Sequence, residues 1–187
     1  MATTIPDRPF VGFPKLARLH RAITITEKID GTNACVVITE DDEIYAQSRN
    51  RIITPDSDNH GFARWVHENQ DDLYALGVGH HFGEWYGAGI QRRYGLDHKR
   101  FALFNTGRWG DPEARPACCH VVPVLCESTA DRLNAEVHTA LSMLRDAGSA
   151  AAPGFMNPEG IVIYHHAARI SFKVTLENDE TPKSLVA

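Results

Sequence analysis

Apolar and polar residues alternate along several short stretches of the sequence, a pattern typical of half-buried antiparallel strands. The alternation predicts eight strands, at 22–29, 34–39, 43–48, 80–87, 100–105, 120–126, 160–166 and 169–176. Two longer segments instead repeat their apolar residues at helical spacing. The pattern therefore predicts strands in both halves of the chain, with few helices between them.

The first predicted helix covers about 61–76 and the second runs from about 128 to 147, where Gly148 is suited to end it. Their apolar stripes are expected to be core: Phe62, Trp65, Val66, Leu73 and Leu76 in the first, and Leu133, Val137, Leu141 and Leu144 in the second. Residues 106–118 carry Gly and Pro and are predicted to form a loop. The predicted fold class is α+β, with helices packed against antiparallel sheets.

One polar segment, Glu27 to Asn33, interrupts two apolar runs with the sequence "EKIDGTN". Asp-Gly between strands is typical of a tight hairpin turn, which we predict at Asp30-Gly31. Such a turn does not need Lys28. The lysine is either a solvated charge beside the turn or a nucleophile held in place, and this motif alone favours the first reading.

Composition narrows the class of protein. The 187 residues suit one domain, and no apolar run is long enough to span a bilayer, so we expect a cytoplasmic protein with no membrane partner. The four cysteines contain no C-x-x-C pair and are expected to be reduced. A net charge of −5 argues against a generic nucleic-acid binder, although basic clusters remain at Arg49/Arg51 and at 92–100.

Five further motifs follow "KIDG" in order: "SRNR" at 48–51, "FGEWYG" at 82–87, "FALFN" at 101–105, "EGIVI" at 159–163 and "SFKV" at 171–174. With these six motifs the chain resembles the covalent nucleotidyltransferase superfamily of ATP-dependent DNA and RNA ligases and capping enzymes. It looks closest to bacteriophage-type, nick-sealing RNA ligases, whose nucleophile motif reads E-K-x-x-G-T-N. The resemblance implies the ATP-grasp-like catalytic domain of ligases.

The resemblance also implies a mechanism. Lys28 would attack the α-phosphate of ATP, and the resulting lysyl-AMP would pass its AMP to a 5′-phosphate end of RNA, which a 3′-hydroxyl then seals. Lys173 would contact the α-phosphate, where negative charge accumulates. Glu159 would hold Mg²⁺ or Mn²⁺. The remaining nucleotide-binding positions implied are Glu27, Asp30, Gly31, Asn33, Arg49 (phosphate), Glu84 (ribose) and Phe104 (adenine stacking).

Each of these residues also has an ordinary structural reading. Phe104 could be a core aromatic, Lys173 a solvated edge lysine and Glu84 an exposed strand residue; the order of all six motifs favours the functional reading. Two positions depart from the family pattern. Ser171 replaces the first lysine of a K-x-K motif, for which Arg169 could substitute, and Asn105 replaces an acid after the stacking aromatic.

Chain length bears on the architecture. Only 14 residues follow Lys173, so we expect a stand-alone nucleotidyltransferase domain over 1–187 without an OB-fold. It is expected to be a monomer, with an accessory protein that could help it to bind nucleic acid, and to lie in the host cytoplasm if phage-encoded. The alternatives are a minimal ATP-dependent DNA ligase, an adenylyltransferase that stops before sealing, and a catalytically weak nucleotide or nucleic-acid binding module.

Overall fold

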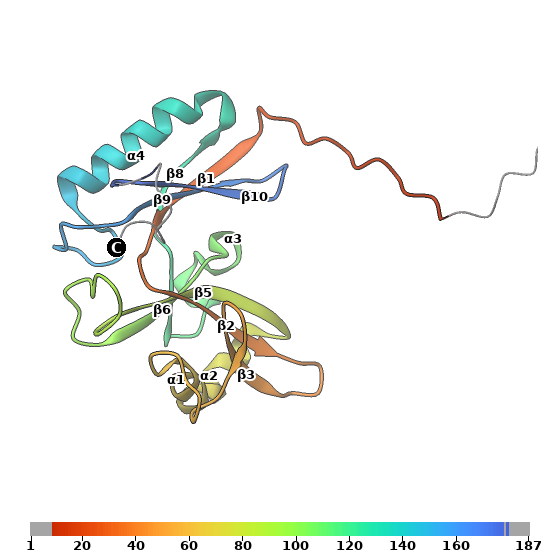
Figure 1. Ribbon diagram of the computed structural model, residues 1–187, viewed down its shortest axis with the longest axis vertical. Coiled ribbons are helices and arrows are strands. Elements are labelled where there is room, and N and C mark those ends of the chain that lie inside the picture. The colour runs from red at the N-terminus through yellow and green to blue at the C-terminus, as the bar shows by residue number, and fades with distance from the viewer. Residues whose placement is uncertain (1–8, 178, 180–187) are drawn as a thin grey trace, which may run out of the picture.

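The strands of this protein form two sheets that lie one above the other in Figure 1, a computed structural model that describes residues 9–177 and 179. Sheet A has four antiparallel strands in the order β10-β9-β1-β8. These strands are β10 (Ile170–Thr175), β9 (Gly160–His165), β1 (Ala22–Lys28) and β8 (Val124–Thr129). Helix α4 (Leu133–Ala147) packs against one face of sheet A, and the short helix η3 (Ala130–Arg132) leads into it (Figure 1).

Sheet B has six strands in the order β4-β3-β2-β5-β6-β7, and only the last pair is parallel. The strands are β2 (Thr32–Ile38), β3 (Ile44–Ser48), β4 (Ile52–Ile53), β5 (Gly79–Gly87), β6 (Lys99–Leu103) and β7 (Cys119–Val121). A second hydrophobic core lies between sheet B and three short helices, α1 (Phe62–Glu68), α2 (Gln70–Leu73) and η1 (Tyr74–Leu76). The α+β fold class with antiparallel sheets is confirmed.

The predicted hairpin at Asp30-Gly31 is wrong. Strand β1 pairs with β8 and β9 in sheet A, whereas β2 pairs with β3 and β5 in sheet B. Residues 29–31 are therefore the crossover by which the chain passes from one sheet to the other. A second crossover divides the predicted strand 120–126 into β7 and β8 at Val122-Pro123, and the Glu27 backbone N–H donates to the Pro123 carbonyl, 3.0 Å away.

Local side chains account for the other differences from the predicted elements. The predicted helix 61–76 breaks at Asn69, whose backbone N–H and side-chain amide both donate to the Trp65 carbonyl. The predicted loop 106–118 contains two short helices, α3 (Thr106–Trp109) and η2 (Pro112–Ala114). Helix α4 ends before Gly148, as predicted, and that glycine has a positive φ of 78°.

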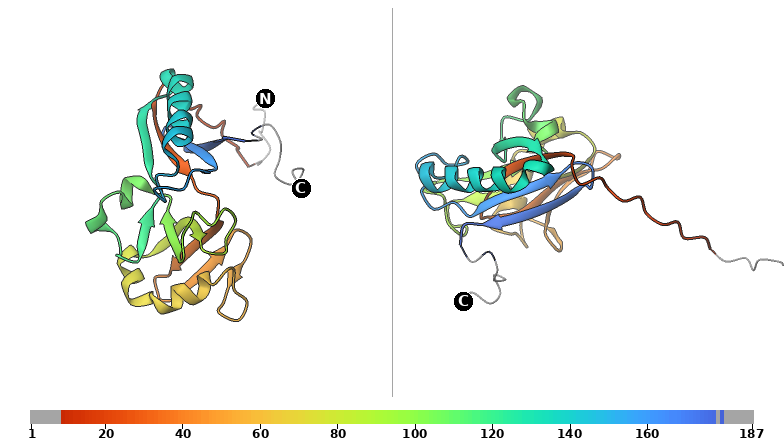
Figure 2. Two further views of the ribbon diagram at one scale, coloured as in Figure 1. Left: turned by 90° about the vertical axis from the view of Figure 1, so that its left-hand side faces the viewer. Right: turned by 90° about the horizontal axis from the view of Figure 1, so that it is seen from above.

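A third small core fills the joint between the sheets. It contains Ile29 of the first crossover and Val122 of the second, packed with Tyr86, Tyr94 and Ala102. The joint is thus held by its own buried side chains. Residues 9–20 have no regular secondary structure and run away from this body, as the second view of Figure 2 shows.

Candidate active site

Lys28 lies at the last position of β1, where the chain leaves sheet A. Lys28 pairs with Gly160, the first residue of β9, so Glu159, which directly precedes β9, lies next to Lys28. The Lys28 Nζ donates to Glu159 Oε2 at 2.5 Å. The Glu159 side chain is 2% exposed and that of Lys28 is 22% exposed. The amine is therefore held at the joint between the sheets, with one side open to solvent.

Glu84 comes to the same joint from sheet B. Its carboxylate accepts hydrogen bonds from the Gly31 backbone N–H at 3.0 Å and from the Asn33 side-chain amide at 3.2 Å. Strand pairing fixes this contact, because Asn33 of β2 lies directly opposite Glu84 of β5. Burial raises the pKa of Glu84 to about 7, although the nearby Lys28 charge and the two hydrogen bonds work against that rise. Glu84 thus ionises close to neutral pH.

Two glycines in these motifs are required by close approach of the backbone. A Cβ on Gly31 would lie 2.4 Å from the Trp85 carbonyl oxygen. Gly160 has a φ of 155°, and a Cβ there would lie 2.2 Å from the Val174 carbonyl oxygen. Both contacts are too short for any side chain. Asp-Gly and Glu-Gly in the sequence therefore mark where strands crowd together beside Lys28 and Glu159.

Arg92 ties the crossover to the segment before Glu159. Its Nε donates to Asp30 Oδ2 at 3.1 Å, and its Nη1 donates to the Asn157 side-chain oxygen at 2.7 Å. Tyr94 completes this support, because its hydroxyl accepts from the Asp30 backbone N–H at 2.7 Å. Arg92 lies outside all six sequence motifs. The only signal in the sequence was its place in the basic cluster 92–100.

Glu27 points away from this group. Its two carboxylate oxygens accept from the Ser149 hydroxyl at 2.6 Å and from the Ala151 backbone N–H at 2.9 Å. Burial raises its pKa, and those hydrogen bonds oppose the rise. The structure therefore places Glu27 against the loop after α4, as a support for β1. It does not bring this residue together with Lys28, Glu84 and Glu159.

Three of the predicted residues lie around the joint. Lys173 of β10 lies in register with Val162 and Thr26, so it shares a face of sheet A with Lys28, two strands away. Arg49 is exposed and directly follows Ser48, the last residue of β3. Ser48 pairs with Ala34 of β2, which is the residue after Asn33. Phe104 is 42% exposed at the end of β6. Its exposure argues against the alternative of a core aromatic.

The fold and the motif region match known RNA ligases. The sequence profile of the RNA ligase family matches residues 21–175, most of the chain. The chain belongs to the RNA ligase family. No curated protein matches the sequence.

Solved structures of RNA ligases share the fold. One is a variant of the Naegleria gruberi RNA ligase with ATP and Mn, at a TM-score of 0.65 and 21% identity over 85% of this chain and 51% of that one. Another is an archaeal ATP-dependent RNA ligase, at a TM-score of 0.61 and 17% identity over 91% of this chain and 50% of that one. The chain thus spans about half the length of the solved RNA ligases it matches.

Both departures from the family pattern have a visible setting. Asn105 is the N-cap of α3, and its side-chain oxygen accepts from the Arg108 backbone N–H at 3.1 Å. Ser171 of β10 lies opposite Tyr164 of β9, on the face of sheet A that also carries Lys173. Arg169, considered as a substitute for the missing lysine, precedes β10 in a turn with a φ of 54°. It is therefore not part of that strand face.

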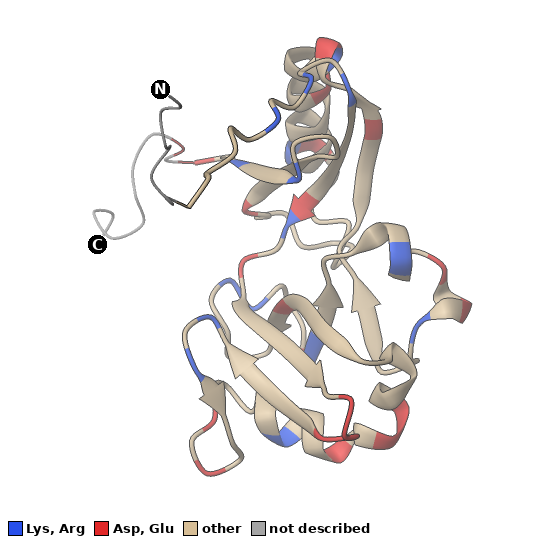
Figure 3. Cartoon of the chain, turned by 90° about the vertical axis from the view of Figure 1, so that its right-hand side faces the viewer, with Lys and Arg blue, Asp and Glu red and all other residues tan. Residues whose placement is uncertain are grey.

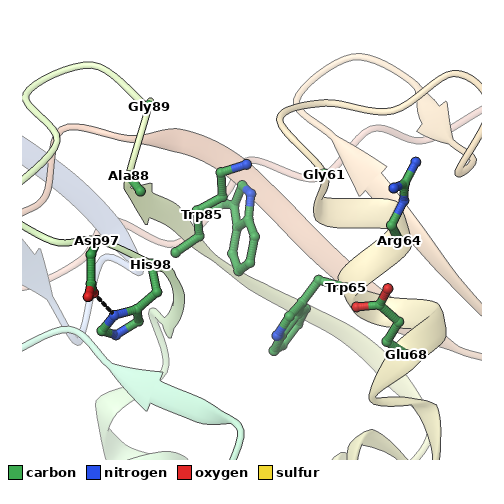
Figure 4. A pocket seen from close by; sticks show the side chains of 10 residues that line it. Gly61, Arg64, Trp65, Glu68, Trp85, Ala88, Gly89, Asp97 and His98 are labelled. Carbon is green, nitrogen blue, oxygen red and sulfur yellow. Dashed lines mark hydrogen bonds and ion pairs between the residues drawn. The ribbon is translucent and has the colours of Figure 1, made fainter.

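A separate hollow lies among the described residues on another side of β5. It has a volume of about 620 Å³ and is lined by α1 and by residues 85–99, with Trp65 and Trp85 between its walls (Figure 4). Trp85 points to the opposite face of β5 from Glu84, so this hollow does not open onto the joint. The residues around Lys28 carry the chemical arrangement, and we locate the candidate site by them.

The donor set at the joint fits a hydrated divalent ion. The described part of the chain has no cluster of three or more His, Cys, Asp or Glu side chains that could hold a metal ion by itself. Mg²⁺ commonly binds through one or two carboxylates together with water and substrate phosphates. Glu159 offers such a carboxylate beside Lys28. The fit is thus to an ion shared between protein and nucleotide.

Charge and hydropathy agree with the composition. In the side view of Figure 3, segments with basic residues and segments with acidic residues are interspersed along the described part of the chain. The described helices include none that is long and apolar enough to cross a membrane.

Proposed function

We propose that this protein is an ATP-dependent RNA ligase that works through a covalent Lys28–AMP intermediate. The observation that carries the proposal is the contact of Lys28 Nζ with Glu159 Oε2 at the joint, beside the Glu84 network. An amine held by a carboxylate at a rigid crossover has the fixed direction that nucleophilic attack requires. Membership of the RNA ligase family supports the same chemistry.

In the first step, the Lys28 amine attacks the α-phosphorus of ATP. A P–N bond forms, the P–O bond to pyrophosphate breaks, and the amine gives up a proton. Before attack the ammonium must lose its proton and leave its ion pair with Glu159. A divalent ion at Glu159 would neutralise phosphate charge. Lys173 would add a cation from the same sheet face, and Arg49 one from sheet B.

Nucleoside recognition is proposed for sheet B. Glu84 would accept a hydrogen bond from a ribose hydroxyl, and Phe104 would stack on adenine. Asn33 and Gly31 orient the Glu84 carboxylate. Asp30, anchored by Arg92, would fix the crossover. AMP would then move from Lys28 to a 5′-phosphate end, and a 3′-hydroxyl would displace it to seal the RNA.

Residues 1–187 would act as one nucleotidyltransferase domain. We also propose that an accessory protein contributes to substrate binding. Bacteriophage-type nick sealing and a role in RNA repair belong to the same proposal. The monomeric state and the cytoplasmic location stay predictions.

The intact mass of the purified protein after incubation with ATP and Mg²⁺ or Mn²⁺ tests the first step. We expect a gain of one AMP that is absent in Lys28→Ala and retained in Lys15→Ala, a change in the exposed N-terminal segment. Protein free of bound AMP that gains no adduct with either metal would instead be a binding module.

Nicked duplexes test the strand preference. RNA and DNA on the 3′-hydroxyl side of the nick are compared at equal enzyme concentration. We expect sealing with RNA in that position. Equal sealing of all-DNA nicks would identify a minimal DNA ligase, and an adenylylated 5′ end that is never joined would identify an adenylyltransferase.

A further inference from the structure

Strand β5 carries exposed aromatic rings beyond Glu84 on the same face. Side chains alternate along a strand, so Phe82 and His80 point to the side of Glu84, whereas His81 and Trp85 point into the protein. Phe82 is 57% exposed, and none of the three buried clusters among the described residues contains it. A large apolar ring left in water beside a binding site commonly marks a contact surface.

The exposed rings form a continuous row. The Phe104 backbone N–H donates to the Phe82 carbonyl at 2.9 Å, so the two phenylalanines come from adjacent points on β5 and the end of β6. The His80 ring lies 6.0 Å from the Phe82 ring with an angle of 19° between their planes. We call Phe82, His80 and Phe104 the aromatic row. Beside it on the neighbouring strand β2, Cys35 pairs with Phe82 and Val37 pairs with His80, and both of these smaller residues are buried.

The aromatic row extends further than one nucleotide requires. Strand rise places Phe82 about 7 Å and His80 about 13 Å along β5 from Glu84. If the ribose of ATP is held at Glu84, its adenine needs one ring, for which Phe104 is predicted. Phe82 and His80 then remain, both exposed and with an angle of 19° between their ring planes.

We propose that Phe82 and His80 of the aromatic row bind unpaired bases of the RNA substrate by stacking, next to the nucleotide site at Phe104. This inference rests on the proposed function and specifies how the RNA is held. Every base has a π-face, so stacking on exposed aromatic rings tolerates any sequence. Arg49, exposed beside Asn33 at the Glu84 end of the row, supplies a phosphate-binding cation.

The first experiment measures binding of single-stranded RNA by fluorescence anisotropy, without ATP. Two probes of equal length and phosphate number are compared, one with bases and one abasic, both with 5′-hydroxyl ends that cannot be adenylylated. We expect the wild type to bind the probe with bases about tenfold more tightly. Phe82→Leu should remove most of that difference, and Phe82→Trp should retain it.

Phe172→Leu is the matched control. Phe172 is also 57% exposed but lies in sheet A, on the face opposite to Lys173. This variant should bind both probes as the wild type does. Equal loss in Phe82→Leu and Phe172→Leu, or wild-type discrimination in Phe82→Leu, would overturn the aromatic row as a base-binding surface.

The second experiment separates this surface from the adenine pocket. The ATP concentration that gives half of the maximal adduct is measured for Phe82→Leu and Phe104→Leu. Phe104→Leu should raise it about tenfold, and Phe82→Leu should leave it unchanged. A rise in Phe82→Leu with unaltered RNA binding would assign Phe82 to adenine and refute the inference. If the wild type forms no adduct, the proposed function fails, while the probe comparison can still be read.

Discussion

The two sheets supply different kinds of residue to the joint between them. Sheet A contributes charged groups, the Lys28–Glu159 pair and Lys173, on the strands next to the first crossover. Sheet B contributes hydrogen-bonding and aromatic groups, the Glu84–Asn33 contact and the exposed rings beyond it. Under the proposed function, sheet A would perform the phosphoryl chemistry and sheet B would recognise the nucleoside and bases. Each half can then be disturbed separately.

Replacing the buried carboxylate of sheet A should have the largest effect. Glu159→Gln keeps the shape of the side chain but removes the charge that orients Lys28 and would hold a divalent ion. We expect the rate of Lys28–AMP formation to fall about 100-fold, since electrostatic groups at a phosphoryl-transfer site commonly contribute that much. Glu127→Gln, on exposed β8 of the same sheet, is the control and should retain the wild-type rate. Equal rates in the two variants would remove Glu159 from the mechanism.

The carboxylate of sheet B should instead be visible in the pH dependence of stability. Folding raises the pKa of Glu84 from 4.5 to about 7, so the folded protein binds this proton more tightly than the unfolded chain. The resulting stabilisation is fully present below pH 4.5 and is lost as the pH rises towards 7. Between pH 5 and 8, we expect the free energy of unfolding to drop about 2 kcal/mol more in the wild type than in Glu84→Gln.

Urea unfolding of both proteins at the two pH values measures this difference. Burial also raises the pKa of Glu27, but that contribution is common to the two proteins and cancels. Parallel pH profiles would show that Glu84 is not responsible, and that its contact with Gly31 and Asn33 is made by an ordinary surface carboxylate.

Arg92 connects the two halves, so its loss should affect both. Arg92→Lys keeps the charge but cannot contact Asp30 and Asn157 with a planar fork. We expect about tenfold slower adduct formation and a loss of about 1 kcal/mol in stability. Arg93→Lys, at the exposed neighbouring position, should change neither. In a double-mutant cycle with Asp30→Asn the two effects should be less than additive, and full additivity would contradict the connection.

The sequence was informative where structure depends on nearby residues. Strand and helix periodicity located nearly all the longer elements, because burial of one face leaves its mark every two or four residues. Asp-Gly was misleading, because the sheet that β1 joins is decided by β8 and β9, more than 90 residues away. The local preference for a turn was real, but the crowding of Gly31 against Trp85 explains the glycine instead.

The site shows the same limit. Lys28 and Glu159 are 131 positions apart, and only their motifs, by resemblance, brought them together. No motif included Arg92, whose partners lie 62 and 65 positions away in irregular segments. Asn105 caps α3, a helix inside the predicted loop 106–118. An aspartate would cap this helix equally well, so the cap does not explain the departure from the family's acid.

The smallest expected effect concerns the lysine missing from sheet A. Residue 171 shares the face of Lys173, one row further from Lys28, so Ser171→Lys adds a second cation at a distance. A unit charge about 10 Å away in a water-like medium contributes roughly 0.4 kcal/mol, which corresponds to about a twofold faster adduct formation. Ile170→Lys places the same charge on the opposite face of β10 and should leave the rate unchanged. Rates measured at low and high salt decide the cause, because screening should abolish the gain. A gain of the same size in Ile170→Lys would show that net charge causes the faster reaction. The contribution of sheet A to the reaction would then not depend on which of its faces carries the lysine.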